Sequence, residues 1–400
     1  MSEAKTCLLI GGIEGGSTQS TCIIINQNGE VLSKVIGPST NPWLFKSDDD
    51  WAKVIKDLVD SCKKSLICSS QEFEGSRVTL DTLGISMSGS EADHVTKLER
   101  LLMDSYDESE MAKHVSINHD TDGSIFTASN EGGIVLIGGT GSAAQLYYPP
   151  EAGLVGDLDK FRIGGWGYLL GDEGSAYWVS LKAIKTIYNH NDKLVTCFYS
   201  TQKVETLMNH YFKIQHPDDI LKYFYKNFDK SFVAKFCLEI VRGANNRDPL
   251  CLHLLKNAGK ELAKHVLALL RKADLRRFGK QPEIKVICVG SMWNNWEYMK
   301  EGLIETLNTF THPTPKENPD LVKADENGLD FNHSDINDAN NGKLKNGIDS
   351  DPLSLPVLSF FCLRETAAIG AAYSSALSRL NRKIPIDYAK TTQFLYTHYF

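Results

Sequence analysis

The sequence predicts a mixed α/β protein with two domains, and three observations support this prediction. The 400-residue chain is longer than one hydrophobic core usually serves. Its first part reads as three strands, a helix, a strand and a helix, an order typical of a mixed sheet covered by helices. A further strand-like run, residues 133–137, begins a second set of such elements.

Composition and charge are those of an ordinary globular protein. Hydrophobic residues make up 42% of the chain and charged residues 23%, which allows sizeable cores. The formal net charge of −7 shows no basic excess and argues against nucleic acid as a partner. The 9 cysteines include no C-x-x-C pair, which indicates reduced residues in a cytoplasmic protein. No apolar run reaches about 18 residues, so no membrane span is expected.

A glycine-rich loop, residues 11–20, joins two strand-like runs, residues 7–10 and 21–25. Because a strand rather than a helix follows, the loop is neither a Walker loop nor a dinucleotide fingerprint. Its backbone N–H groups and hydroxyls can still bind phosphate oxygens, and Glu14 is placed to position Mg²⁺ through water. A plain glycine-rich hairpin is the alternative. The turn signal Asn28-Gly29 leads into a third strand.

Polar residues mark the remaining turns of the first domain. Ser39–Trp43 is a polar turn that carries an amide and an indole. Ser47 with Asp50 is a capping pattern at the start of a helix-period run. Residues 82–88 alternate as a strand and end in Ser-Gly-Ser, and a second helix-period run follows.

The strand-like residues 114–118 lead directly to His119, Asp120 and Asp122. Carboxylates just past the end of a strand lie where α/β sheets place ligand chemistry. A carboxylate here can act as a general base for an attacking hydroxyl. The alternative is a helix cap made by Asp120 or Asp122. His119 has no second His or Cys at metal-binding spacing, so it is not predicted to bind metal.

Two more glycine-rich segments follow. Gly138–Ser142 lies between strand-like residues 133–137 and 143–148, so it is a second hairpin of glycines and hydroxyls. Gly164–Trp178 reads as a shaped loop that ends in a helix, with Asp172 or Glu173 as the helix cap or as a group reaching into a cavity. The two glycine hairpins, 11–20 and 138–142, with the acidic strand end between them form a far more specific pattern than any one of them alone.

The chain after residue 176 is predicted to be mainly helical, with two further strands. Strand 285–289 breaks at Gly290-Ser291, which could receive a nucleoside or simply pack. Residues 313–352 are poor in apolar side chains and are predicted to be a disordered surface insertion. The helix-period runs are 202–212, 218–227, 231–243, 249–272 and 364–380, and the last strand is 355–361.

These motifs, in this order, resemble the sugar-kinase branch of the actin, hexokinase and heat-shock ATPase superfamily. Within that branch the chain is most similar to the eukaryotic N-acetylglucosamine kinases of the BadF-type ATPase group. The resemblance implies a two-lobed actin-like ATPase (ribonuclease H-like) fold, with a mixed five-stranded sheet in each lobe and a central cleft. The implied boundaries are 1–125 for the N-terminal lobe, 126–380 for the C-terminal lobe, and 381–400 for a segment returning to the N-terminal lobe.

By this resemblance Asp120 takes the proton from the sugar 6-hydroxyl, and Asp122 fits that role less well. The implied sugar-binding residues are Asn41, Asp120, Ser142, Ala143, Gly165, Trp166, Gly167 and Asp172. The implied ATP-binding residues are Gly15, Gly16, Ser17, Thr18, Thr140, Gly141, Ala234, Gly290 and Ser291. Ala143 departs from the Asn that is frequent in relatives, so one side-chain contact to the sugar is expected to be lost or replaced by backbone.

The implied reaction is the phosphorylation of N-acetyl-D-glucosamine at O6 by ATP with Mg²⁺ in amino-sugar salvage. N-acetyl-D-glucosamine and ATP are then the ligands, and the resemblance implies a homodimer. Two alternatives stay open. One is a superfamily ATPase that drives a partner protein, although those with an iron–sulfur centre need paired cysteines that this chain lacks. The other is a non-catalytic scaffold that kept the fold.

Overall fold

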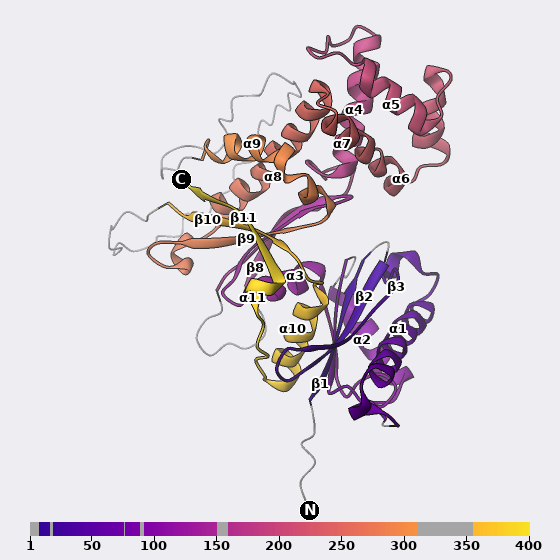
Figure 1. The fold of residues 1–400 in the computed structure, drawn as a ribbon, viewed down its shortest axis with the longest axis vertical. Coiled ribbons are helices and arrows are strands. Elements are labelled where there is room, and N and C mark those ends of the chain that lie inside the picture. Colours follow the sequence, from indigo (N-terminus) through magenta and orange to yellow (C-terminus); the bar gives the residue numbers. More distant parts are fainter. Residues whose placement is uncertain (1–7, 17–18, 76, 89–91, 150–158, 311–354) are drawn as a thin grey trace, which may run out of the picture.

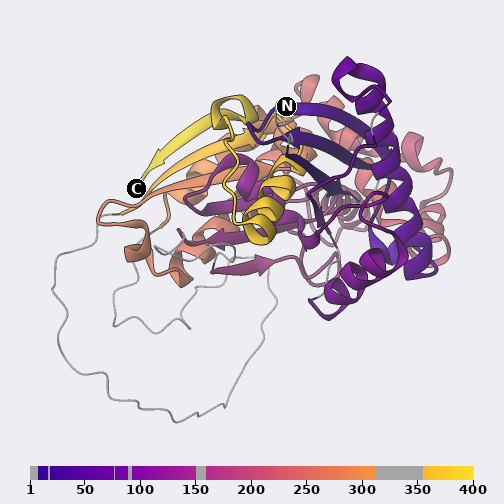
Figure 2. The ribbon, with the colours of Figure 1, turned by 90° about the horizontal axis from the view of Figure 1, so that it is seen from below.

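The computed structural model describes residues 8–16, 19–75, 77–88, 92–149, 159–310 and 355–400. Two β-sheets lie one above the other, each with helices packed on it (Figure 1). In the turned view of Figure 2, α10 lies between the strands of the first sheet and the last strands of the second. The predicted insertion, residues 313–352, lies outside the described residues.

The first sheet has the five strands that the resemblance implied, and their order is β3-β2-β1-β4-β5. β1, β2 and β3 form an antiparallel meander, while β4 and β5 run parallel to β1. The antiparallel pairing of β1 and β2 confirms the hairpin prediction. The predicted loop 11–20 was too long, because residues 11–15 belong to β1 and residues 19–20 to β2. The strand bounds are β1 Leu9–Gly15, β2 Gln19–Asn26, β3 Val31–Pro38, β4 Thr82–Met87 and β5 Val115–His119.

Helices cover both faces of this sheet. α1 (Asp48–Ser69) and α2 (Ala92–Ser105) pack on one face, and α3 (Asp120–Ala128) and α10 (Ala368–Leu380) on the other. α1 starts where the capping pattern predicts, because Ser47 Oγ accepts a hydrogen bond from the backbone N–H of Asp50 at 3.1 Å.

The second sheet has six strands in the order β11-β10-β9-β6-β7-β8, one more than the resemblance implied. The two strands that the sequence patterns did not predict, β8 and β11, are its two edges. β6 and β7 form the second predicted hairpin around Gly139–Gly141. The strand bounds are β6 Gly133–Gly138, β7 Ser142–Tyr147, β8 Lys160–Gly164, β9 Glu283–Val289, β10 Val357–Leu363 and β11 Thr392–Tyr399.

A helical region covers one side of the second sheet and forms a common core with it. Two predictions need correction here. Residues 218–227 form a 3₁₀ turn, Pro217–Ile220, and a π turn, Lys222–Lys226, rather than an α-helix, and the π turn buries no side chain that would stabilise a longer helix. Residues 231–243 divide at Phe236 into two helices. The helix bounds are α4 Ala176–Asn191, α5 Gln202–Phe212, α6 Lys230–Lys235, α7 Cys237–Asn245, α8 Pro249–Lys272 and α9 Trp296–Leu307.

The C-terminal part of the chain is not divided between the two lobes as the resemblance implied. α10, expected in the C-terminal lobe, packs on β1 and β4 of the first sheet. Ile384 and Pro385 then lie against the β2–β3 turn at Gly29. After the short helix α11 (Tyr388–Thr391), β11 pairs antiparallel with β10 in the second sheet rather than ending on the first.

Candidate active site

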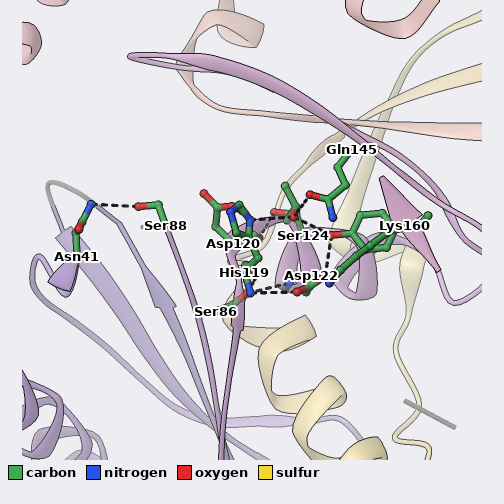
Figure 3. Close-up of polar contacts among 12 residues, drawn as sticks. Asn41, Ser86, Ser88, His119, Asp120, Asp122, Ser124, Gln145 and Lys160 are labelled. Atoms are coloured by element: carbon green, nitrogen blue, oxygen red, sulfur yellow. Dashed lines mark hydrogen bonds and ion pairs between the residues drawn. The ribbon is translucent and has the colours of Figure 1, made fainter. Parts of the chain in front are cut away.

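Asp120 is the first residue of α3 and follows β5 without a loop. Its side chain is about one-third exposed, and its Oδ1 lies 2.6 Å from His119 Nδ1. Burial lowers the pKa of His119, but the hydrogen bond and charge of Asp120, with the charge of Asp122, outweigh burial and raise it. The carboxylate of Asp120 is thus held from one side and open on the other (Figure 3).

Asp122 has the structural role that the sequence left open between the two aspartates. Its Oδ2 accepts from the backbone N–H of His119 at 3.0 Å, which caps α3. Its Oδ1 accepts from Tyr147 Oη at 2.8 Å and from Lys160 Nζ at 2.6 Å. Because Asp122 is 6% exposed and fully engaged, the cap does not require Asp120.

The two sheets are joined beside Asp120 by a chain of polar contacts. Thr121 Oγ1 donates to Gln145 Oε1 on β7 at 3.0 Å, and Tyr147 Oη lies 2.7 Å from Thr121 Oγ1. From the first sheet, Ser86 Oγ donates to the His119 carbonyl at 2.6 Å and accepts from the Gly123 N–H at 2.9 Å. The strand–helix junction that carries Asp120 is therefore fixed by both sheets.

Asn41 lies at the same end of the first sheet as Asp120 (Figure 3). Its Oδ1 accepts from the Trp43 N–H at 3.0 Å, which caps the short 3₁₀ turn Pro42–Leu44. Its Nδ2 lies 3.5 Å from Ser88 Oγ, just past the end of β4. The Nδ2 group of Asn41 thus makes one weak side-chain contact that a ligand could replace.

The β6–β7 hairpin is closed by the glycine-rich loop that follows β8. Asp172 Oδ1 accepts from the Ser142 N–H at 3.0 Å, and Ser142 Oγ donates to the Glu173 carbonyl at 2.7 Å. The helix cap predicted for Asp172 or Glu173 is wrong, because Ser175 Oγ accepts from the Trp178 N–H and caps α4. Asp172 instead holds the hairpin.

The end of β9 meets this hairpin. Gly290 has φ +104°, and a Cβ there would lie 2.5 Å from the Gly138 carbonyl oxygen. Thr140 and Gly141 at the hairpin tip and Ser291 after β9 are therefore brought to one place. A glycine cradle of this kind fits the phosphates of ATP. Ala234 is buried in α6, where its carbonyl accepts from Ser180 Oγ.

The β1–β2 hairpin supplies the other predicted phosphate residues. The Gly16 N–H donates to the Gln19 carbonyl at 3.2 Å, and Gly15 lies against Thr40 and Met87 with no room for a Cβ. Ser17 and Thr18 lie outside the described residues.

Glu14, the proposed Mg²⁺ residue, accepts with Oε2 from the Thr366 hydroxyl and from the Ala367 N–H. These two bonds leave Oε1 for a hydrated cation. Within the described ranges, no group of three or more His, Cys, Asp or Glu side chains could hold a metal. A single carboxylate such as Glu14 fits Mg²⁺ that keeps water and phosphate oxygens as its other ligands.

Trp166 stands at the rim of the predicted sugar site. It is 66% exposed, and the Arg162 guanidinium carbon lies 4.9 Å from its ring centroid. Gly165 and Gly167 on either side have φ +73° and +81°, which explains the glycines of this motif. A Cβ at Gly165 would lie 3.2 Å from the Ala143 Cβ, so these predicted residues are neighbours.

Four residues around the site were not predicted from the sequence. Each contacts a residue of one of the motifs that the sequence marked: Gln145, Lys160, Arg162 and Lys230. Lys160 and Arg162 alternate on a short edge strand, and that pattern becomes readable only once the strand is known.

The structure has an actin-like ATPase fold of the sugar-kinase type. Two mixed β-sheets are joined through α3 and α10, and two glycine hairpins lie with an acidic strand end between them in the chain. Two solved structures share this fold. A proposed N-acetylglucosamine kinase from Chromobacterium violaceum has a TM-score of 0.54 and 17% identity, covering 75% of this chain and 93% of that one. A proposed N-acetylglucosamine kinase from Porphyromonas gingivalis has a TM-score of 0.53 and 19% identity, covering 75% and 90%.

Residues 12–319 match the BadF/BadG/BcrA/BcrD ATPase family, and the chain belongs to this family. The N-acetylmuramic acid/N-acetylglucosamine kinase of Clostridium acetobutylicum is 25% identical over 44% of this chain and 53% of its own. The N-acetyl-D-glucosamine kinase of Dictyostelium discoideum is 27% identical over 46% of this chain and 55% of its own length. The chain thus spans about half the length of these relatives. In the described part, no helix is long and apolar enough to cross a membrane.

Proposed function

We propose that this protein transfers the γ-phosphoryl group of ATP to O6 of N-acetyl-D-glucosamine. The observation that carries the proposal is that Asp122 and Asp120, at the start of α3, have different contacts. Asp122 supplies the cap and the ion pair with Lys160, so the Asp120 carboxylate, held only at Oδ1, is free to meet a hydroxyl. Family membership and the names of the relatives support the same activity.

In the proposed reaction the sugar O6 forms a bond to the γ-phosphorus while the bond from that phosphorus to the bridging oxygen of ADP breaks. Asp120 aligns the hydroxyl and receives its proton, a role worth about 10² to 10⁴ in rate. The backbone N–H groups of the two hairpins donate to the phosphoryl oxygens. Mg²⁺, when bound, neutralises charge on the phosphates, and Glu14 would hold it through water.

The N-acetyl group is the proposed main determinant of specificity. Ser142 precedes Ala143 and bonds to Asp172, and Gly165, next to Trp166, lies against the Ala143 side chain, so these residues are neighbours. A site built to bind an amide leaves buried polar groups unpaired when the amide is missing. Sugars without it, such as glucose, should therefore be poor acceptors. We also propose a cytoplasmic homodimer, which sedimentation equilibrium and fractionation would test.

The experiment is a coupled ATP-dependent assay over N-acetylglucosamine, N-acetylmannosamine, N-acetylmuramic acid, glucosamine and glucose. N-acetylglucosamine should be turned over best. Asp120→Asn should lower the turnover rate about 10²- to 10⁴-fold, while sugar binding, measured by calorimetry, is largely kept. Asp60→Asn, an exposed change on α1, is the matched control and should leave the rate unchanged. ATP hydrolysis without sugar transfer would favour a partner-driving ATPase, and no turnover of either kind would favour a scaffold.

A further inference from the structure

Two cysteines lie side by side on neighbouring strands of the second sheet. Cys288 on β9 and Cys362 on β10 are directly opposite each other in the parallel register of these strands. Both face the helical region, Cys288 within its core and Cys362 packed against that core. Neighbouring strands lie about 4.8 Å apart, which is within the Cα separation of about 4.4 to 6.8 Å that a disulfide spans. The two thiols can therefore bond with little movement of the backbone.

The two thiols differ in access to solvent and in acidity. Cys288 is 2% exposed, whereas Cys362 is partly exposed. Burial and the neighbouring Cys362 raise the pKa of the Cys288 thiol, and the hydrogen bond from Cys288 lowers the pKa of Cys362. The thiolate is the reactive form of cysteine, so Cys362 is the thiol that meets an oxidant. An accessible thiolate beside a second thiol is the arrangement found in redox-sensing proteins.

We propose that Cys288 and Cys362 are a redox modification site, at which hydrogen peroxide forms a reversible disulfide. The Cys362 thiolate attacks one peroxide oxygen, so that an S–O bond forms and the O–O bond breaks. The second oxygen leaves as hydroxide and takes the proton that the Cys362 thiol has lost, which gives one water.

The buried thiol completes the reaction. Cys288 loses its proton and attacks the sulfur of the Cys362 sulfenic acid, so that the S–S bond forms as the S–O bond breaks. The released hydroxide takes the proton of Cys288 and becomes the second water. In total two thiols are oxidised to one disulfide and one hydrogen peroxide is reduced to two waters. A dithiol reverses the change by thiol–disulfide exchange.

Each cysteine lies just before a segment of the candidate active site. Gly290, a predicted ATP-binding residue, comes just after Cys288 and lies against the β6–β7 hairpin. Thr366, which donates to Glu14, comes just after Cys362. An S–S bond is much shorter than the contact between two thiols, so the disulfide should draw these two strand ends together. The effect on activity rests on the kinase function proposed above: displacement of Gly290 should weaken the binding of ATP.

A second pair of cysteines provides an internal comparison. Cys22 on β2 and Cys62 on α1 are also neighbours, because the Cys62 thiol donates to the Cys22 carbonyl at 3.5 Å. Both side chains are 0% exposed. Neither thiol can meet an oxidant in the folded protein, so this pair should stay reduced. Access of Cys362 to solvent, and not proximity alone, therefore distinguishes the proposed site.

The test treats the folded full chain with hydrogen peroxide and maps its disulfides by mass spectrometry of unreduced peptides. Wild type should yield a cross-link between Cys288 and Cys362 that dithiothreitol removes. In Cys288→Ser, Cys362 should stop at the sulfenic acid, which dimedone traps. In Cys362→Ser, Cys288 should stay reduced. Cys68→Ser removes an exposed cysteine of α1 and is the matched control, so it should form the same cross-link as wild type.

Steady-state kinetics on the same samples tests the consequence. Peroxide should raise the KM for ATP several-fold in wild type and in Cys68→Ser, dithiothreitol should reverse the rise, and Cys362→Ser should show none. No cross-link between Cys288 and Cys362, or a cross-link between Cys22 and Cys62 instead, would overturn the proposal. A cross-link with an unchanged KM would overturn the effect on ATP. Absence of sugar turnover in the reduced wild type would overturn the proposed kinase function, and the peptide map would still decide the disulfide.

Discussion

Asp172 Oδ1 accepts a hydrogen bond from the backbone N–H of Ser142 at 3.0 Å, so one carboxylate closes the β6–β7 hairpin. Its other oxygen lies 2.7 Å from Lys230 Nζ at the start of α6, a contact within ion-pair distance. Asp172 is 4% exposed and has φ +65°, a left-handed conformation that Asp tolerates better than most residues. This side chain therefore links the β6–β7 hairpin, the glycine-rich loop after β8 and the start of α6.

Asp172→Asn should keep the acceptor for Ser142 and lose the charge opposite Lys230. We expect a loss of about 1 to 2 kcal/mol in the free energy of unfolding, less than for a fully buried pair, because Lys230 is about one-third exposed. Asp172→Ala should lose about 1 kcal/mol more and raise the KM for ATP, since the hairpin is released. Urea unfolding of the single and double variants, with Lys230→Met as the second substitution of a double-mutant cycle, measures the interaction free energy between Asp172 and Lys230. Equal losses in both Asp172 variants would contradict a role for the hydrogen bond.

The approach of α10 to the first sheet depends on two glycines. A Cβ at Gly84 would lie 1.9 Å from the Ala371 carbonyl oxygen, and one at Gly12 would lie 2.0 Å from that of Ala368. Gly84→Ala should therefore displace the helix and lower the free energy of unfolding by about 3 kcal/mol. Gly139→Ala, where the nearest atom is 3.9 Å away, is the control and should cost much less. Urea unfolding measures the free energy of unfolding of both variants. Similar losses in Gly84→Ala and Gly139→Ala would contradict the close packing of α10 on the first sheet.

Local patterns predicted the central elements of both sheets because those strands are buried and their turns carry distinctive residues. The hairpins after β1 and β6 were recognised from glycines between β-branched runs. β8 and β11 were missed for a physical reason. Both are edge strands, and several of their side chains are exposed, so their apolar pattern is weak.

The site was predictable where a motif is contiguous in the chain and not where two segments meet. Asp120 followed from its place after a strand. That Asp122 and not Asp120 caps α3 depends on Lys160 and Tyr147, which lie on two strands of the other sheet. The contact of α10 with the first sheet likewise joins residues from opposite ends of the chain.

Lys63 makes the stability of the first lobe depend on pH. Its Nζ donates to the carbonyls of Ser109, Glu110 and Met111, and it is 7% exposed. Burial lowers its pKa to about 8. Between this value and about 10.4 the unfolded chain binds more protons than the folded one, so the contribution of Lys63 to stability rises with pH across this window.

The measurement is the free energy of unfolding of wild type and of Lys63→Met at pH 7, 8, 9 and 10. The variant does not titrate at this position and leaves the three carbonyls without the amine, so it should be less stable throughout. The gap between the two proteins should widen from pH 8 to pH 10. A constant gap would show that the amine keeps an ordinary pKa in the folded protein.

Glu14 combines two tasks that different substitutions can separate. Its Oε2 holds the start of α10 through Thr366 and the Ala367 N–H, and we propose that Oε1 binds a hydrated Mg²⁺. Glu14→Gln keeps an acceptor for Ala367 and removes the charge, so it should raise the Mg²⁺ concentration needed for half-maximal activity several-fold, with a stability loss of about 1 kcal/mol. Thr366→Val removes one donor and leaves the carboxylate, so it should show the same stability loss and the wild-type Mg²⁺ requirement. If both variants lose stability and neither changes the Mg²⁺ requirement, Glu14 is an anchor of α10 alone, because the charge would then matter only to the helix start.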